Sequence, residues 1–466
     1  MTSLRVCVDV GSTWTKGLLV DVGDGSGGDG DGDGSHGPDR LLPTLDAADG
    51  VLRSPGVVAT AQHRTTLDTD VMDGVAGVVA QLGHAVGAHP VAFGQPLVCS
   101  SAGGGLRLGV VGYERVVTAE AARRAAVSAG GRVVHLASGR LQPDDVAALV
   151  AARPDVVVLT GGTDGGDGEV LLANATALAP ALAAAGLPVV LAGNADVAPE
   201  AEGALAATGV RVTRVGNVLP RIGDLRPGPA RAAVREAFLR HVIGGERLSR
   251  GRGFDRLVLA ATPDAVLAGV EQLARRFPGG VLVVDVGGAT TDVYSVLSQP
   301  AVDAADDDVA GTEGAARTVE GDLGMRWSAP GVLDAAATER LDVPRLRDDA
   351  VVDAVGALAA RPDHVPVDPA GEHLDTAVAT GAAVTAVRRH ARPGAPGGPG
   401  RPLRDVELLV GSGGVLRHGD AARARAVLGA VLDDHAGAWH VPDAAVPVVD
   451  RDYVLCALGL LALARA

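Results

Sequence analysis

The sequence predicts an α/β protein made of two related halves, with a further α/β unit inserted between them. The first observation is residues 281–297, VLVVDVGGATTDVYSVL, where an apolar run ends in an aspartate and a glycine turn leads into a second apolar run. Residues 4–20, LRVCVDVGSTWTKGLLV, repeat this scheme. Strand-like and helix-like segments then alternate regularly from about residue 90 to residue 215. A motif that recurs in one chain indicates structurally related domains.

The stretch at 281–297 predicts a strand, a tight turn and a second strand, because β-branched residues flank a pair of glycines. Glycines let the backbone approach a ligand, exposed N–H groups in such a turn attract anions, and Thr hydroxyls donate to phosphate oxygens. The candidate phosphate-binding residues are Gly287, Gly288, Thr290 and Thr291. Taken alone, the pattern is equally consistent with a glycine-rich hairpin that binds nothing.

The copy near the N-terminus strengthens the phosphate hypothesis and adds charged residues to it. Its matching turn residues are Gly11, Ser12, Thr13 and Thr15. Asp9 and Asp285 end the two first strands, 276 positions apart, and carboxylates at such places can hold Mg²⁺ through water. Lys16 is the only lysine in the chain, which indicates that a compact ammonium is needed there to stabilise phosphate charge. The alternative is that one lysine survived by chance in an arginine-rich sequence.

A third motif completes the set near the C-terminus. LLVGSGG, at Leu408–Gly414, is an apolar strand that ends in a glycine cluster. In this order the three motifs resemble those of the actin-like ATPase superfamily, whose duplicated domains are ribonuclease H-like. The resemblance implies that ATP and Mg²⁺ bind between the halves, with the adenosine on Gly411, Ser412, Gly413 and Gly414. It does not say what the ATP is used for.

Length and composition set the domain organisation. A chain of 466 residues is too long for one core, and we expect domains at 1–88, 89–220 and 221–466. Because 47% of residues are hydrophobic and only 2% aromatic, the cores must be built from Val, Leu and Ala. The middle domain is expected to be a doubly wound parallel unit. Its loops at 100–105 and 161–168 are candidates either for a ligand or for simple tight connections, and residues 90–215 are our candidate for a partner-facing surface.

Charge and cysteine content exclude several classes of function. A net charge of −15 argues against partners such as nucleic acid or an anionic membrane. No apolar run reaches the ~18 residues of a membrane span, and no secretory leader is evident, so we expect a cytoplasmic protein, in which an oligomer is possible. The three cysteines are far apart, without the spacing of a metal site, and are expected to be reduced, buried thiols: Cys7, Cys99 and Cys456.

Three further segments complete the sequence analysis. The segment RTVEGDLGMRWS, at Arg317–Ser328, places Glu320, Asp322 and Arg326 close together. Glu320 is the candidate for a carboxylate that positions water beside the nucleotide; a solvated acidic loop is the alternative. The Asp/Gly-rich stretch Gly23–Arg40 lacks the spacing of a calcium loop and is expected to be a flexible connection. Asp303–Gly311 is expected to be an acidic turn.

Several of these segments together resemble one family within the superfamily. VDVGSTWTKG, LVCSSAGGGLRLGVVG, VVVLTGGTDGG, GNVLPRIG, VVDVGGATTDVYSV, VEGDLGMRWSAPG and VGSGGVLRH follow one another in order. They are similar to the glutamate mutase accessory proteins, the MutL/GlmL family, over essentially the whole chain. The resemblance implies an ATP-dependent reactivating chaperone with ATPase activity, whose partner is an adenosylcobalamin-dependent mutase of the glutamate mutase or aminomutase class. Hydrolysis would be coupled to a conformational change. The chain has no DxHxxG cobalamin motif.

Three other classes share parts of the pattern. A sugar-type kinase would need a catalytic aspartate in a substrate cleft, and the sequence singles out none. The activators of hydroxyacyl-CoA dehydratases have a similar first loop, but they hold an iron–sulfur cluster on cysteines, which three scattered cysteines do not favour. A filament protein of actin type is the third, and the large inserted unit argues against it. The kinase is the main alternative.

Overall fold

The computed structural model describes residues 4–23, 41–46, 49–102, 106–113, 131–222, 224, 226, 228–238, 248–250, 253–297, 314–341, 343, 349–393, 400–436 and 440–465. Residues 24–40 of the expected connection Gly23–Arg40 and the acidic turn expected at 303–311 lie outside these residues. The chain forms two compact units. The first comprises Met1–Ala102, Leu257–Val302 and Gly311–Ala466; the second comprises Gly103–Arg256 and Asp303–Ala310.

The first unit begins with a five-stranded sheet in the order β12-β6-β1-β2-β5. β2 is antiparallel to both β1 and β5, and β6 runs parallel to both β1 and β12. The expected hairpin at 4–20 forms its centre, since a turn of three residues joins β1 to β2. The strands are β1 (Leu4–Val10), β2 (Trp14–Asp21), β5 (Val57–Arg64), β6 (Leu97–Ser100) and β12 (Val258–Ala261).

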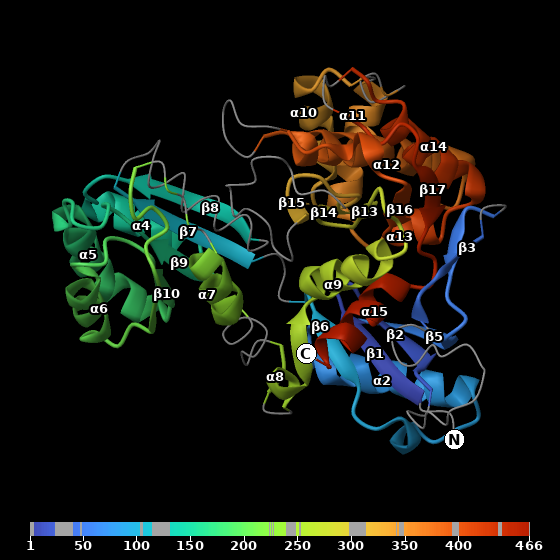
Figure 1. Cartoon of the computed structure of the whole chain (residues 1–466), viewed down its shortest axis with the longest axis horizontal. Helices are drawn as coiled ribbons and strands as arrows, with labels where there is room; N and C mark the ends of the chain where they lie inside the picture. Colours follow the sequence, from blue (N-terminus) through green and yellow to red (C-terminus); the bar gives the residue numbers. More distant parts are fainter. Residues whose placement is uncertain are drawn as a thin grey trace. The chain divides into compact units, whose positions relative to one another are not determined.

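The second sheet repeats this arrangement strand for strand (Figure 1). Its order is β15-β14-β13-β16-β17-β4-β3, where β14 is antiparallel to both β13 and β15, and β16 is parallel to both β13 and β17. The strands that repeat the first sheet are β13 (Val281–Val286), β14 (Thr291–Val296), β15 (Ala315–Glu320), β16 (Leu408–Ser412) and β17 (Val446–Val449). The common order and directions are those of a duplicated ribonuclease H-like domain, as the repeated motif predicts.

The boundaries between the domains differ from those expected. The short strands β3 (Thr44–Asp46) and β4 (Val51–Arg53) come from the N-terminal part of the chain, yet β4 pairs with β17 and so extends the second sheet. β6 and β12 flank the inserted unit and both belong to the first sheet. The insertion therefore spans 103–256, where the sequence placed it at 89–220.

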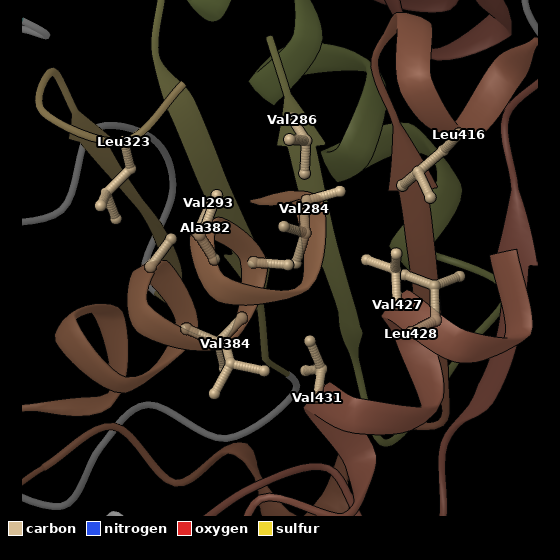
Figure 2. Packing of buried hydrophobic residues seen from close by; sticks show 14 of the residues in the cluster. Val284, Val286, Val293, Leu323, Ala382, Val384, Leu416, Val427, Leu428 and Val431 are labelled. Carbon is tan, nitrogen blue, oxygen red and sulfur yellow. The ribbon is translucent and has the colours of Figure 1, made fainter. Parts of the chain in front are cut away.

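Helices cover both sheets of the first unit. One face of the second sheet packs on α12 and α14, and Figure 2 shows Val284 and Val293 of this sheet beside Ala382 of α12 and Val427 of α14. Valine, leucine and alanine supply nearly all of this core, as the composition predicts. The helices of the unit are α2 (Val71–Ala85), η1 (Pro90–Phe93), α9 (Thr262–Ala274), α10 (Ala329–Thr338), α11 (Asp349–Ala360), α12 (Pro369–Ala391), η3 (Leu403–Asp405), α13 (Gly414–Arg417), α14 (Ala421–Leu432) and α15 (Val454–Leu463).

Helices α9 and α15 cross so closely that their backbones touch (Figure 1). A Cβ atom on Gly269 of α9 would lie 1.9 Å from the carbonyl oxygen of Leu455, and one on Gly459 of α15 would lie 1.7 Å from that of Ala265. Only glycine fits at both positions. The crossing ties α15, which follows β17 of the second sheet, to the first sheet, where Ala457 accepts a weak hydrogen bond from the Cys7 thiol.

The inserted unit is a parallel five-stranded sheet in the order β11-β10-β9-β7-β8. This is a doubly wound order, since the chain changes direction across the sheet between β7 and β9. One face packs on α4, α5 and α6, and the other on α7. The elements are β7 (Leu106–Gly112), β8 (Gly131–Ser138), α4 (Pro143–Ala151), β9 (Val156–Leu159), α5 (Glu169–Ala185), β10 (Val189–Leu191), α6 (Ala198–Ala206), β11 (Val212–Arg214) and α7 (Gly228–Phe238), and α8 (Phe254–Leu257) follows.

No helix within the described residues is long and apolar enough to cross a membrane.

The helix crossing can be tested by adding one methyl group. Gly459→Ala should lower the free energy of unfolding by about 3 kcal/mol or more, because the new Cβ meets a backbone oxygen that cannot move without separating the helices. Gly429→Ala, in α14, is the matched control. Its Cβ meets nothing within 4 Å, so replacing a helical glycine should raise stability by about 0.5–1 kcal/mol. Urea unfolding measures both, and equal effects would contradict the close crossing.

Candidate functional site

The two hairpins match each other residue by residue. Asp9 lies opposite Lys16 in the β1–β2 register, and Asp285 lies opposite Asp292 in the β13–β14 register. The same offset pairs Thr15 with Thr291, each opposite the last residue of its first strand. The duplicated motif is therefore a duplicated structure, and the position of the single lysine is taken by a carboxylate in the second copy.

Both turns close through the same backbone hydrogen bond. The N–H of Gly11 donates to the carbonyl oxygen of Trp14 over 3.1 Å, and that of Gly287 donates to Thr290 over 2.9 Å. A Cβ on Gly11 or Gly287 would lie 2.8 or 2.9 Å from that same oxygen. The geometry thus requires glycine at the first position of each turn, which explains why the sequence repeats it.

Asp9 of the first hairpin makes an ion pair and a hydrogen bond. Its carboxylate is buried, and Lys16 Nζ lies 3.7 Å from Oδ2. Thr262, the first residue of α9, donates its hydroxyl to Oδ1 over 2.5 Å. Because α9 belongs to the helix crossing, the position of Asp9 depends on that packing. The ion pair and the hydrogen bond hold the carboxylate in one orientation at the end of β1.

Tyr453 and Arg417 complete the surroundings of Lys16, and the sequence did not reveal either. The Lys16 ammonium donates to the Tyr453 hydroxyl and lies 3.8 Å from the ring centroid; Arg417 Cζ lies 3.7 Å from the same centroid. Tyr453 adopts a left-handed backbone conformation with φ of 61°, which is uncommon for a residue with a bulky side chain. Burial by itself lowers the pKa of Lys16, but Tyr453, Asp9 and Asp285 together raise it above its ordinary value, so Lys16 is charged at neutral pH.

The pKa values of two acidic residues in the second hairpin are raised. Burial raises the pKa of Asp285, and Asp9 raises it further, while Lys16 and a hydrogen bond from Ser412 oppose the shift. Burial, with Asp285 as the second cause, raises the pKa of Asp292 from 3.8 to about 7. Asp292 Oδ1 has no hydrogen-bond partner in the described part of the chain.

The C-terminal glycine motif lies directly beside the second hairpin. β16 pairs with β13, and Ser412 lies opposite Asp285 in that register. Gly413 has φ of 93°, and a Cβ there would lie 2.1 Å from the carbonyl oxygen of Val286. Gly411 packs against Leu416 and Leu428, whereas a Cβ on Gly414 would meet nothing within 4 Å. The structure thus brings the second and third motifs together.

The segment that carries Glu320 packs on the second turn. Met325 N–H donates to the carbonyl oxygen of Gly287 and Arg326 N–H donates to that of Gly288, over 2.9 and 2.8 Å. Glu320 lies opposite Thr291 in the β14–β15 register, and its carboxylate accepts a hydrogen bond from Arg389 over 2.7 Å. Asp322 accepts from the same Arg389 nitrogen over 2.8 Å, so Glu320 and Asp322 lie together as expected, whereas Arg326 pairs with Asp375.

Not every predicted phosphate-binding hydroxyl faces outward. Thr15 is fully buried, and its hydroxyl bonds that of Thr65 over 3.1 Å. Thr291 is also fully buried, and its hydroxyl has no partner within the described ranges. Ser12 and Gly288 are exposed at the tips of the two turns, and Thr13 and Thr290 are partly exposed. The turn tips therefore present polar groups to solvent, whereas the hydroxyls of Thr15 and Thr291 on the following strands do not.

A cavity of about 340 Å³ lies beside Lys16. Polar side chains of β5 and α2 form one part of its lining, Gln62 and Gln81 among them, and Arg417, His418 and Tyr453 form another. Its volume is at the lower end of the range for small-molecule sites. His418 is the C-cap residue of α13, and its backbone N–H donates to the carbonyl oxygen of Gly414.

Two ribonuclease H-like sheets with matched aspartate turns, and a third glycine motif beside one of them, define an actin-like ATPase fold. A family model described as "MutL protein" matches residues 5–466. Protein MutL of Clostridium tetanomorphum is 34% identical over 435 residues, which cover 88% of this chain and 92% of that protein. The chain belongs to the MutL family, as its motifs predicted.

Solved structures with similar folds have much lower identity. Nucleotide-free acetone carboxylase is 12% identical, with a TM-score of 0.41, over 99% of this chain and 70% of that one. An activator of 2-hydroxyisocaproyl-CoA dehydratase from Clostridium difficile, with bound ADPNP, is 10% identical, with a TM-score of 0.30, over 99% of this chain and 95% of that one. The fold assignment rests on the strand order of this chain.

The raised pKa of Asp292 predicts a pH dependence of stability. The native protein holds a proton on Asp292 that the unfolded chain releases near pH 4, so the free energy of unfolding should fall as pH rises from about 4 to 7. Asp292→Asn removes this loss. At pH 8 this substitution should raise the free energy of unfolding by about 2 kcal/mol. That is roughly half of the free energy that the full pKa shift corresponds to, because the side chain is partly exposed.

Urea unfolding at pH 5 and pH 8 measures this effect. Asp334→Asn, which changes an exposed carboxylate on α10, is the matched control and should leave the pH dependence unchanged. The same change of stability with pH in wild type and Asp292→Asn would contradict the assignment.

Proposed function

We propose that this chain is an ATP-dependent accessory protein that reactivates an adenosylcobalamin-dependent mutase of the glutamate mutase or aminomutase class. The observation that carries the ATP-binding part is the pair of matched hairpins, which bring Asp9, Lys16 and Asp285 into electrostatic contact at the ends of two equivalent strands. Membership of the MutL family supports the accessory role and the mutase as partner.

The polar groups of the site suit a nucleotide triphosphate. The exposed turn tips carry backbone N–H groups that can receive phosphate oxygens, and Lys16 supplies a fixed positive charge beside them. Adenosine would lie against the bare backbone of Gly413 and Gly414, where no Cβ intervenes. The turn residues proposed to contact phosphate are Gly11, Ser12, Thr13, Gly287, Gly288 and Thr290.

Magnesium fits the donor set of Asp9 and Asp285. Carboxylate oxygens are hard ligands that Mg²⁺ accepts, mostly through its retained water. Burial raises the pKa of Asp285, and the charge of Asp9 adds to this against Lys16; a divalent cation beside both carboxylates would favour their charged forms. When bound, the ion would neutralise charge on the phosphates.

Lys16 is held by Tyr453 and Asp9 before any ligand arrives. To contact a phosphate, its ammonium would exchange the Tyr453 hydroxyl for a phosphate oxygen. Glu320 remains the proposed water-positioning carboxylate, and its contact with Arg389 would have to open for that role. Because burial raises the pKa of Glu320, release from Arg389 would make it a stronger base.

The inserted unit is the surface that we propose for the mutase. Its loop at residues 161–168 follows β9, beside the point where the strand order reverses, which is where doubly wound sheets bind their ligands. Asn194 and Asn217 hold this loop by donating to the carbonyl oxygens of Gly166 and Gly162, each over 3.0 Å. A loop fixed in this way can present a constant surface to a partner.

The test is recovery of mutase activity after inactivation during turnover. With this protein and Mg–ATP, activity of the matching adenosylcobalamin mutase should return, and ATP hydrolysis should rise when the inactive mutase is present. Lys16→Ala should lower the hydrolysis rate by about 100-fold while nucleotide affinity falls much less, because the ammonium acts mainly on transferring charge.

Arg340→Ala, which changes an arginine on the loop after α10, is the control for loss of a positive charge and should behave as wild type. ATP-independent recovery would contradict the proposal. Phosphate transfer to a sugar or polyol in place of recovery would move the chain to the kinase class.

A further inference from the structure

Two of the three cysteines, which are distant in sequence, meet beside Asp9 in the core beneath the first hairpin. Cys99 Sγ and Cys456 Sγ lie 3.3 Å apart, although the residues are separated by 357 positions. Cys99 Sγ also lies 3.7 Å from Asp9 Oδ1. One ligand atom from each of these three residues lies within 4.8 Å of the other two. All three side chains are buried, as expected for the cysteines.

The fold fixes this cluster from three directions. Asp9 on β1 and Cys99 on β6 are direct neighbours in the parallel register, so their side chains point to the same face of the first sheet. That face also contacts α15, which carries Cys456, and α15 is held there by the glycine crossing with α9. The donors are therefore preorganised by elements that cannot move independently.

The donor set determines the class of ligand. Two sulfur atoms and one carboxylate oxygen suit a thiophilic divalent cation of the Zn²⁺ type, with the fourth position open. In a tetrahedral zinc site with Zn–S bonds of about 2.3 Å, the sulfur atoms lie about 3.8 Å apart, so the observed separation needs only a small adjustment. Hard cations such as Mg²⁺ avoid such sulfur donors.

Charge balance also favours a divalent ion. Two thiolates, one carboxylate and one divalent cation sum to a single negative charge, and the ammonium of Lys16, 3.7 Å from Asp9, neutralises it. Burial raises the pKa of Cys99 well above its ordinary value, so the thiols are neutral when no metal is bound, and binding must release their protons.

We propose that Cys99, Cys456 and Asp9 bind one thiophilic divalent cation, and that this occupancy withdraws Asp9 from the candidate nucleotide site. The first part stands on the cluster alone. The second part rests on the proposed function, because Asp9 can inhibit ATP use only if it takes part in it. The ion would thus act as an inhibitor of ATP turnover rather than as its cofactor.

The experiment uses Cd²⁺ as a spectroscopic probe on the full chain, in a buffer with a phosphine reductant that keeps thiols reduced. One equivalent of Cd²⁺ should produce thiolate-to-metal charge-transfer absorption. Added Zn²⁺ should displace Cd²⁺ and so remove this absorption. The affinity should rise with pH, because two protons are released on binding. Cadmium-113 NMR of the wild-type protein gives a readout that needs no variant, and should report a ligand set with two sulfur atoms.

Matched variants assign the ligands. Cys99→Ala or Cys456→Ala should weaken Cd²⁺ binding by more than the ~10–100-fold that loss of an outer-shell partner costs. Cys7→Ala is the control: it removes a third buried thiol on the same face, whose Sγ contacts the carbonyl oxygen of Ala457, and binding should remain as in wild type. Far-UV circular dichroism shows whether each variant is folded.

Absence of charge-transfer absorption in the wild-type protein, or absorption that depends on Cys7, would overturn the proposal. A cadmium-113 shift typical of oxygen ligands would do the same. ATP hydrolysis measured on the same samples keeps the two proposals apart. Absorption with no ATPase activity at any metal level would leave the metal site standing and remove the proposed function. ATPase activity that full Cd²⁺ occupancy does not lower would refute the inhibitory part.

Discussion

The backbone contact between α9 and α15 at Gly269 and Gly459 is the constraint on which the site depends. It draws α15 onto the first sheet, although α15 follows a strand of the second sheet. Tyr453 at the start of α15 thereby reaches Lys16, and Thr262 at the start of α9 reaches Asp9. Residues from both duplicated domains are thus held around one pair of charged side chains. A larger residue at either glycine would break both of these contacts.

Local motifs made much of the fold predictable. A glycine turn after an aspartate-ended strand depends on neighbours in sequence, and both hairpins formed where the pattern placed them. The parallel inserted unit followed from the alternation of strand and helix segments. The sequence also predicted the MutL family, because several motifs in a fixed order are far more specific than any one of them.

Contacts between distant segments were not predictable in this way. Nothing in the short stretch 44–53 indicates that β4 pairs with β17 and so extends the second sheet. Tyr453 lies 437 positions from Lys16, and Cys456 lies 357 positions from Cys99. Spacing rules for metal ligands examine neighbours along the chain, so they missed a cluster that only packing assembles. The motif predicted that the Thr15 hydroxyl binds phosphate, but this hydroxyl is buried against Thr65.

The central claim is that the two matched hairpins form one nucleotide site. Calorimetric titration of the full chain with a non-hydrolysable ATP analogue and Mg²⁺ tests it most directly, in wild type, Asp9→Ala and Asp285→Ala. We expect one nucleotide per chain for wild type and loss of Mg²⁺-dependent binding in both variants, with folding retained. Unchanged affinity in both variants, or two independent nucleotides per chain, would contradict a single site shared by the two hairpins.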